Sequence, residues 1–121
     1  NEDEINRFVN INSRVYGLSY NYIKYSENNG SNWTNCMNGL PNSYNNPWLL
    51  FDTFTYNSEE IFICSSSGNI WKSNQSSIEW KVFDDNLPEF VNGNGITLFT
   101  LDDDYLYFVN GNKLWRKKIN E

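Results

Sequence analysis

The chain has 121 residues, enough for one domain that buries roughly two thirds of the surface of its unfolded state. Its net charge is -6 and its one basic cluster, Arg116-Lys117-Lys118, lies at the end of the chain, which argues against a nucleic-acid-binding surface built from clustered Lys and Arg. No apolar run approaches the roughly 18 residues of a membrane span, and the absence of histidine excludes the usual Ser-His and Cys-His triads and most catalytic zinc sites.

The elements predicted from the N-terminus onward are short β-strands. Apolar residues alternate or form short runs, and Gly, Asn, Ser and Pro interrupt them every few positions, which is typical of strands and turns. We expect Arg7 and Arg14, on either side of the first hairpin, to form an exposed cross-strand pair. The strands of this first unit are predicted at Arg7 to Ile11, Arg14 to Ser19, Tyr22 to Ser26 and Asn32 to Cys36.

Two further units follow, and the chain is therefore predicted to be all-β. The middle unit has a longer first hairpin, from Thr53 to Glu60, and the third unit lacks a fourth strand. Strands of the middle unit are predicted at Trp48 to Phe54, Glu60 to Ser65, Asn69 to Ser73 and Ile78 to Phe83. Those of the third unit are predicted at Ile96 to Leu101, Tyr105 to Val109 and Lys113 to Lys117.

A turn motif recurs in the first two units. Ser26-Glu27-Asn28-Asn29-Gly30-Ser31-Asn32-Trp33, followed by Asn38-Gly39-Leu40-Pro41, returns forty-seven residues later as Ser73-Asn74-Gln75-Ser76-Ser77-Ile78-Glu79-Trp80, followed by Asp85-Asn86-Leu87-Pro88. At a shift of ninety-one residues the first unit also aligns with the third, and the aligned pairs are Phe8 with Phe99, Val15 with Leu106, Tyr16 with Tyr107 and Ile23 with Leu114. Such a period indicates repeated units, each of which needs a neighbour to bury its apolar face.

The turn resembles the Asp-box, or BNR repeat, whose pattern is Ser-x-Asp-x-Gly-x-x-Trp. The first copy has Asn28 at the acid position, the second has Gln75 and Ser77 at the acid and glycine positions, and the third has Lys117 at the serine position. Glycine accepts a positive φ, and Asn or Ser side chains bond to nearby backbone in such turns. We therefore interpret the motif residues as structural, and they are Ser26, Asn28, Gly30, Trp33, Ser73 and Trp80.

The resemblance implies a β-propeller whose blades are four-stranded antiparallel meanders, with the box as the turn between the third and fourth strands. One propeller segment is then expected over residues 1–121, with blades at about 5–37, 48–84 and 95–121, the last incomplete. Single-ring propellers have four or more blades, so the first and last blades would each expose an apolar face. We expect an excerpt of a longer propeller, a second copy that completes the ring, or a different subunit that does so.

Asp-box propellers include sialidases, so the resemblance raises the possibility of a glycoside hydrolase. Those enzymes are similar to one another in an arginine triad that holds the substrate carboxylate, whereas this chain has Arg7, Arg14 and Arg116 and lacks the Arg-Ile-Pro motif. The sequence places no two carboxylates as a glycosidase requires. The run Asp102-Asp103-Asp104 lacks the spaced ligands of a calcium loop, and we interpret it as a hairpin tip. We predict no catalytic residue, metal or cofactor in this chain.

The predicted function is that of a non-catalytic binding or interaction module in a secreted or cell-surface protein, with a protein partner or a glycan as ligand. Propeller ligands usually bind where the loops between blades meet those between the second and third strands, and flat aromatic rings there suit sugars or peptides. The candidate ligand-binding residues are Tyr20, Tyr44, Trp48 and Phe90. In the alternative interpretation, Trp48 and Phe90 pack at blade junctions. Two other functions stay open: a fragment of a sialidase-like hydrolase with catalytic residues outside this chain, and a structural scaffold subunit of a larger assembly.

The two cysteines fall in different units and lack the spacing of metal ligands. We expect Cys36 and Cys64 to be buried thiols, and the alternative is a single disulfide.

Overall fold

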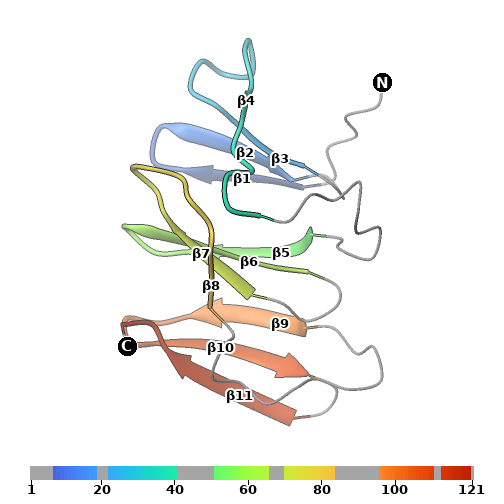
Figure 1. Ribbon diagram of the computed structural model, residues 1–121, viewed down its shortest axis with the longest axis vertical. Coiled ribbons are helices and arrows are strands. Elements are labelled where there is room, and N and C mark those ends of the chain that lie inside the picture. Colours follow the sequence, from blue (N-terminus) through green and yellow to red (C-terminus); the bar gives the residue numbers. More distant parts are fainter. Residues whose placement is uncertain are drawn as a thin grey trace.

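A computed structural model describes residues 7–18, 22–40, 51–65, 70–83, 96–110 and 113–120. All regular structure in these ranges is β, which confirms the all-β prediction. None of the described residues belongs to a helix that is long and apolar enough to cross a membrane. The strands form three small antiparallel sheets, which lie one above another along the long axis of the molecule (Figure 1).

The first sheet is a four-stranded meander, in the order β1-β2-β3-β4. Its strands are β1 (Arg7–Ile11), β2 (Arg14–Leu18), β3 (Ile23–Ser26) and β4 (Thr34–Asn35). The last strand is shorter than predicted, although the Cys36 N–H still donates to the Ile23 carbonyl at 2.9 Å. The expected cross-strand pair of arginines is wrong, because Arg7 pairs with Leu18 and Arg14 pairs with Ile11. The two arginines therefore lie at opposite ends of the hairpin.

The middle sheet repeats this order as β5-β6-β7-β8. Its strands are β5 (Phe51–Tyr56), β6 (Glu60–Ser65), β7 (Ile70–Asn74) and β8 (Lys81–Val82). The end of β5 was predicted too early, because Tyr56 still pairs with Ile61 and the tip lies beyond it. There the Asn57 Oδ1 accepts the N–H groups of Glu59 and Glu60 at 2.9 and 2.7 Å, which closes the turn.

The third sheet has three strands in the described part of the chain, in the order β11-β10-β9. They are β9 (Ile96–Leu101), β10 (Tyr105–Asn110) and β11 (Lys113–Lys118), close to the predicted bounds. The register between β9 and β10 shifts near Val109 and Asn110, so the edge of this sheet is locally irregular.

The core consists of two layers of apolar side chains, one on each face of the middle sheet. Along β6, side chains alternate between faces, as the period of a strand requires. Ile61 and Ile63 pack in the cluster shared with the first sheet, whereas Phe62 and Cys64 pack in the cluster shared with the third sheet. All four side chains are fully buried. Burial of each large apolar side chain stabilises the fold by roughly 1.5–3 kcal/mol, so the middle sheet holds the other two in place.

The strand pairing gives corresponding positions in the three sheets, so their side chains can be compared. At the same diagonal position between the second and third strands, each sheet has a pair of side chains that interact. In the first sheet the Arg14 guanidinium lies 4.1 Å from the ring centroid of Tyr25. In the third sheet the arginine and the tyrosine have changed strands, and the Arg116 guanidinium lies 4.2 Å from the ring centroid of Tyr105. In the middle sheet Lys72 and Glu60 form an ion pair at 3.4 Å. One sheet can therefore be compared with another residue by residue.

The cysteines are buried thiols in different clusters, so no disulfide joins them. Cys36 lies between the first and middle sheets, and Cys64 lies between the middle and third sheets. The Cys36 Sγ donates to the Ile23 carbonyl oxygen at 3.3 Å.

Candidate interaction surfaces

The turn between β3 and β4 is held by two short polar side chains. The Ser26 Oγ, which is buried, accepts the N–H groups of Asn28 and Gly30 at 3.3 and 2.8 Å. The Asn28 Oδ1 accepts the Asn32 N–H at 2.9 Å and the Ser26 hydroxyl at 3.0 Å. Gly30 has φ of 88°, a conformation that costs glycine little and other residues more. Ser26, Asn28 and Gly30 therefore shape this turn.

The equivalent turn between β7 and β8 is held by different hydrogen bonds. The Ser73 Oγ accepts the Glu79 N–H at 2.8 Å, and the Asn74 Oδ1 accepts the Ser76 N–H at 2.9 Å. No residue from 73 to 80, all of which the structure describes, has a positive φ. Ser77 can therefore stand at the position that Gly30 occupies in the first turn. The Gln75 Nε2 instead donates to the Asn57 carbonyl at 2.6 Å, which ties the turn to the β5–β6 tip.

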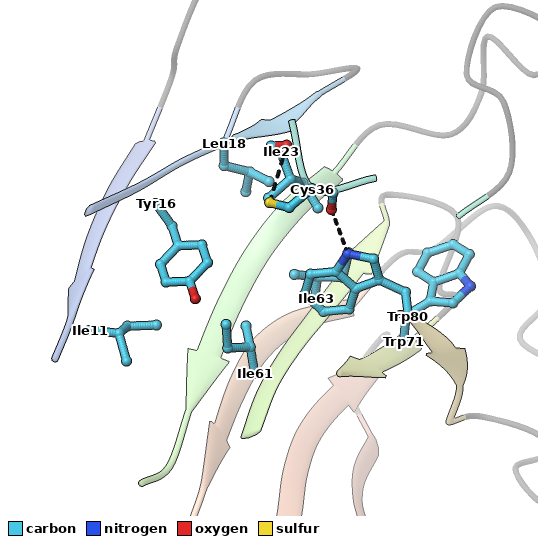
Figure 2. Close-up of a cluster of buried hydrophobic side chains, with 9 residues drawn as sticks. All are labelled: Ile11, Tyr16, Leu18, Ile23, Cys36, Ile61, Ile63, Trp71 and Trp80. Atoms are coloured by element: carbon cyan, nitrogen blue, oxygen red, sulfur yellow. Dashed lines mark hydrogen bonds between the residues drawn. The ribbon is translucent and has the colours of Figure 1, made fainter. Parts of the chain in front are cut away.

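The tryptophan that ends the second turn fastens the middle sheet to the first. Trp80 is 2% exposed, and its Nε1 donates to the Cys36 carbonyl at 2.8 Å (Figure 2). Its backbone N–H donates to the Asn38 carbonyl at 2.9 Å. Gly39 lies so close that an added Cβ would stand 2.3 Å from the Trp80 carbonyl oxygen. The segment that follows β4 therefore fits against Trp80, and this contact requires a glycine.

The tryptophan that ends the first turn has no such neighbour among the described residues. Trp33 is 39% exposed, and Phe8, whose ring centroid lies 6.2 Å away, is 60% exposed. Val9 and Ile11 of the same strand pack toward the middle sheet, so Phe8 faces the other way. We call this surface, which carries Phe8 and Trp33, the N-terminal end face.

The opposite end of the stack also exposes a large apolar side chain. Leu114 on β11 is 75% exposed. Phe108 and Trp115 pack toward the middle sheet, so Tyr107 and Leu114, their neighbours in sequence, lie on the outer side. With Trp115 and Arg116 these two residues line a hollow of about 340 Å³. We call this outer surface of the third sheet the C-terminal end face.

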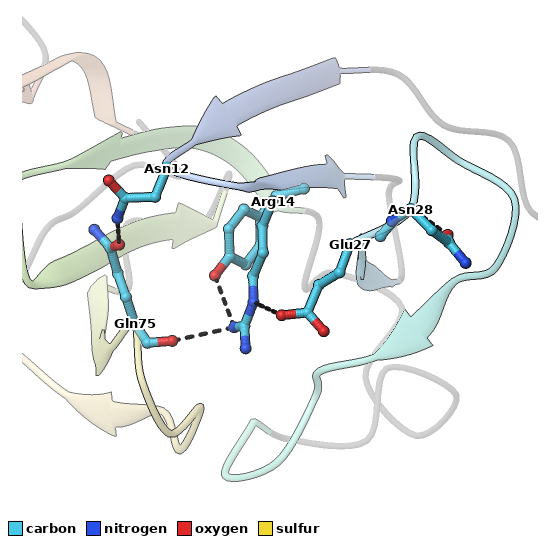
Figure 3. A network of polar contacts seen from close by, with 7 residues as sticks. Asn12, Arg14, Glu27, Asn28 and Gln75 are labelled. Atoms are coloured by element: carbon cyan, nitrogen blue, oxygen red, sulfur yellow. Dashed lines mark hydrogen bonds and ion pairs between the residues drawn. The ribbon is translucent and has the colours of Figure 1, made fainter.

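A third surface is a polar groove of about 440 Å³ at the strand ends where the first and middle sheets meet. Arg14 lines it, and its Nε donates to Glu27 at 2.9 Å while its Nη1 donates to the Tyr16 hydroxyl at 3.3 Å (Figure 3). The Nη1 also donates to the Gln75 carbonyl oxygen at 3.1 Å. Because this last bond crosses from one sheet to the other, Arg14 helps to fix their arrangement.

The groove suits hydrogen bonding to a neutral polar group better than capture of an anion. Burial lowers the pKa of the Arg14 guanidinium, but hydrogen bonds with Tyr16 and Glu27 outweigh it, and the net shift is upward. The cation therefore persists, with the Glu27 carboxylate beside it to balance its charge. Burial raises the pKa of the Tyr16 phenol, so this group stays a neutral hydroxyl. The sequence signalled Arg14 only as one of three arginines.

The acidic run before β10 forms a turn. The Asp102 Oδ1 accepts the N–H groups of Asp104 and Tyr105 at 2.9 and 2.8 Å, and the Oδ2 accepts the Tyr107 hydroxyl at 2.5 Å. These bonds, that of Tyr107 first, lower the pKa of the Asp102 carboxyl. In the part of the chain that the structure describes, no group of three or more His, Cys, Asp and Glu side chains could hold a metal ion. The geometry is that of a hairpin tip.

The predicted ligand-binding residues lie outside the described residues, and they are Tyr20, Tyr44, Trp48 and Phe90. The polar groove is not at their predicted location. It is formed by the β1–β2 and β3–β4 turns and their equivalents, whereas the prediction concerned the opposite ends of the strands. The alignment of Ile23 with Leu114 was the sequence signal that could have revealed the C-terminal end face.

No protein-family model matches the chain, and no curated protein matches it. The resemblance to the Asp-box repeat therefore rests on the residues of the two turns and stays a hypothesis.

Proposed function

We propose that the chain is a non-catalytic interaction module built from Asp-box β-propeller blades. One observation carries the proposal: both ends of the stack expose apolar side chains at repeat positions that are buried inside the stack. Leu114 is 75% exposed, whereas its equivalents Ile23 and Ile70 are fully buried. Exposed apolar patches of this kind mark surfaces that bind another protein or another part of the same assembly.

The blade assignment is supported by the order of the strands and by the turns. Two sheets are four-stranded meanders that pack face to face through apolar clusters, as propeller blades do. In both, the turn between the third and fourth strands begins with a buried serine, Ser26 or Ser73, and ends with a tryptophan, Trp33 or Trp80. These are the places where the Asp-box would lie in a propeller blade.

The non-catalytic assignment is supported by the positions of the arginines. A sialidase-like site needs three that converge on one carboxylate, but Arg7 and Arg14 lie at opposite ends of a hairpin and Arg116 lies in the third sheet. Arg14 is further engaged with Glu27, Tyr16 and the backbone of Gln75. None of the three is arranged for that task.

Footprinting and activity assays test the proposal together. Hydroxyl-radical labelling is applied to the protein in its native source and to the isolated chain at low concentration. We expect Trp33 and Leu114 to be labelled in the isolated chain and protected in the native assembly, and equal labelling would overturn the interaction role. Incubation with fluorogenic glycosides, a sialoside among them, should give no turnover, and sustained turnover would overturn the non-catalytic role.

A glycan array tests whether the ligand is a glycan, the second of the two predicted kinds of ligand. Tyr20, Tyr44, Trp48 and Phe90 remain the predicted ligand contacts. If a glycan binds, alanine at Trp48 should weaken it and alanine at Val82, an exposed residue on β8, should not. Equal effects of the two substitutions would remove Trp48 from the site.

A further inference from the structure

The contact between the first and middle sheets shows what can cover the two end faces. The first sheet presents Tyr16 and Ile23 to the middle sheet, both buried in their shared cluster. The third sheet has Tyr107 and Leu114 at these positions, on its outer side. The C-terminal end face is thus equivalent to the part of the first sheet's contact surface that β2 and β3 supply. The segment from Cys36 to Gly39, which holds Trp80, has no counterpart among the described residues of the third sheet.

The other partner in that contact has its own equivalent. The middle sheet receives the first sheet on a surface that includes Ile61 and Trp80. The first sheet has Val15 and Trp33 at these positions, and Trp33 belongs to the N-terminal end face. The N-terminal end face is thus equivalent to the surface on which the middle sheet receives its neighbour.

We propose that the C-terminal end face of one chain packs on the N-terminal end face of a second copy of the same chain. This inference rests on the proposed interaction role and names its partner. The occupant is a second copy because the two faces of one chain are equivalents of the two halves of a contact that the chain already forms. Such a contact is head-to-tail, so it either closes into a ring or continues as an open array.

The new contact should be weaker than the internal one. Gly17 and Lys24 of the N-terminal end face stand where the middle sheet has the buried Ile63 and Trp71. The exposed ring of Phe8, opposite Gly17 in the register of β1 and β2, restores part of this apolar area. We therefore expect association that depends on concentration.

Sedimentation velocity of the 121-residue chain over a wide concentration range tests the proposal. We expect reversible growth from monomer to dimer or larger species. Phe8→Glu on one face and Leu114→Glu on the other should each weaken self-association at least about tenfold, because each places a charge in a desolvated contact. Val82→Glu is the matched control, since Val82 is 60% exposed on β8, away from both end faces, and it should leave association unchanged. Circular dichroism and urea unfolding verify that each variant is folded.

A mixing experiment separates a head-to-tail contact from a symmetric one. Each variant keeps one intact face, so a mixture of Phe8→Glu and Leu114→Glu should form a dimer of one copy of each and grow no further. Dimers of one variant alone would indicate a face that binds itself and would overturn the proposal. A wild-type chain that stays monomeric at every concentration would also overturn it, and protection of Trp33 in the native source would then assign the faces to other partners and leave the interaction role standing.

Discussion

Two tryptophans at the same place in the repeat have opposite surroundings. Trp80 is buried against the first sheet, where its indole donates to the Cys36 carbonyl and its backbone to that of Asn38. Trp33 ends the equivalent turn and lies beside Phe8 on an exposed face. The residue type is the same, so the difference comes from the neighbouring sheet, which covers Trp80 and has no counterpart at Trp33 among the residues that the structure describes. Comparison of the first and middle sheets thus shows which side chains a sheet can present to a neighbour and which of them are buried in such a contact.

The largest expected effect compares equivalent residues of β7 and β11. Ile70→Ala removes a fully buried side chain from the cluster between the middle and third sheets, so the free energy of unfolding should fall by about 2–5 kcal/mol. Leu114→Ala removes an exposed side chain, and it should change the stability of the monomer by no more than about 0.5 kcal/mol. Urea unfolding at a concentration where the chain is monomeric measures both.

Two outcomes of this comparison would count against the structure. A loss at Leu114 as large as that at Ile70 would mean that the C-terminal end face is covered within one chain. A loss at Ile70 near zero would mean that the third sheet does not pack on the middle sheet. Ile70→Val, expected to cost about 0.5–1.5 kcal/mol, keeps the comparison measurable if the alanine variant does not fold.

A second comparison concerns two glycines with positive φ. Gly39→Ala strains the backbone and also brings the new methyl group into a clash with the Trp80 backbone, which cannot move aside as a side chain could. It should therefore destabilise the chain by about 2–4 kcal/mol. Gly30→Ala has the same backbone problem, but its methyl group would meet a Trp33 ring atom at an ordinary 3.7 Å. Its expected cost is about 1–2 kcal/mol. Thermal unfolding of both variants gives the difference, and equal losses would refute the close contact of Gly39 with Trp80.

A third comparison exchanges each tryptophan for phenylalanine. Trp80→Phe leaves the Cys36 carbonyl without its buried donor and opens space in the cluster, so stability should fall by about 1–3 kcal/mol. Trp33→Phe should stay within about 0.5 kcal/mol of the wild type, because its ring is partly exposed. Guanidinium unfolding is monitored by far-ultraviolet circular dichroism, because the loss of a tryptophan changes the fluorescence of each variant. Should both variants lose the same amount, Trp33 would have a neighbour in the monomer.

The sequence predicted the strands better than the contacts between side chains. Strands such as β1, β6 and β9 have their predicted bounds because alternating apolar residues and polar turns are local signals. The end of β5 was missed because its last two residues are held by pairing with β6, which sequence periodicity alone does not determine.

The surfaces were harder to predict, for physical reasons. The predicted pairing of Arg7 with Arg14 was wrong because the register of a hairpin depends on its turn. The role of Arg14 in joining two sheets was missed because it depends on a hydrogen bond to Gln75, which is distant in sequence. The end faces follow from the repeat only once the burial of equivalent positions is known. That knowledge requires the stacking of the sheets, which no local pattern gives.

The smallest expected effect is a loss of stability at high pH, which arises in the contact between the first and middle sheets and not at the end faces. Cys36 lies in the contact beneath Trp80, and burial raises the pKa of its thiol from 9.0 to about 12. In the unfolded chain this thiol ionises from about pH 9, whereas in the folded chain it stays neutral. The stability that it contributes is therefore complete below pH 9 and is lost as the pH rises toward 12.

Comparison with Cys36→Ala isolates this loss from the ionisation of the tyrosines, which both proteins share. Between pH 8 and pH 10 the wild type should lose about 1.4 kcal/mol more stability than the variant, measured by urea unfolding under reducing conditions. Parallel losses in the two proteins would show that the thiol meets water, and hence that the first and middle sheets are not closed over it. A steeper loss in the wild type would instead place Cys36 in a contact that excludes solvent, which is the property that the end faces lack in the isolated chain.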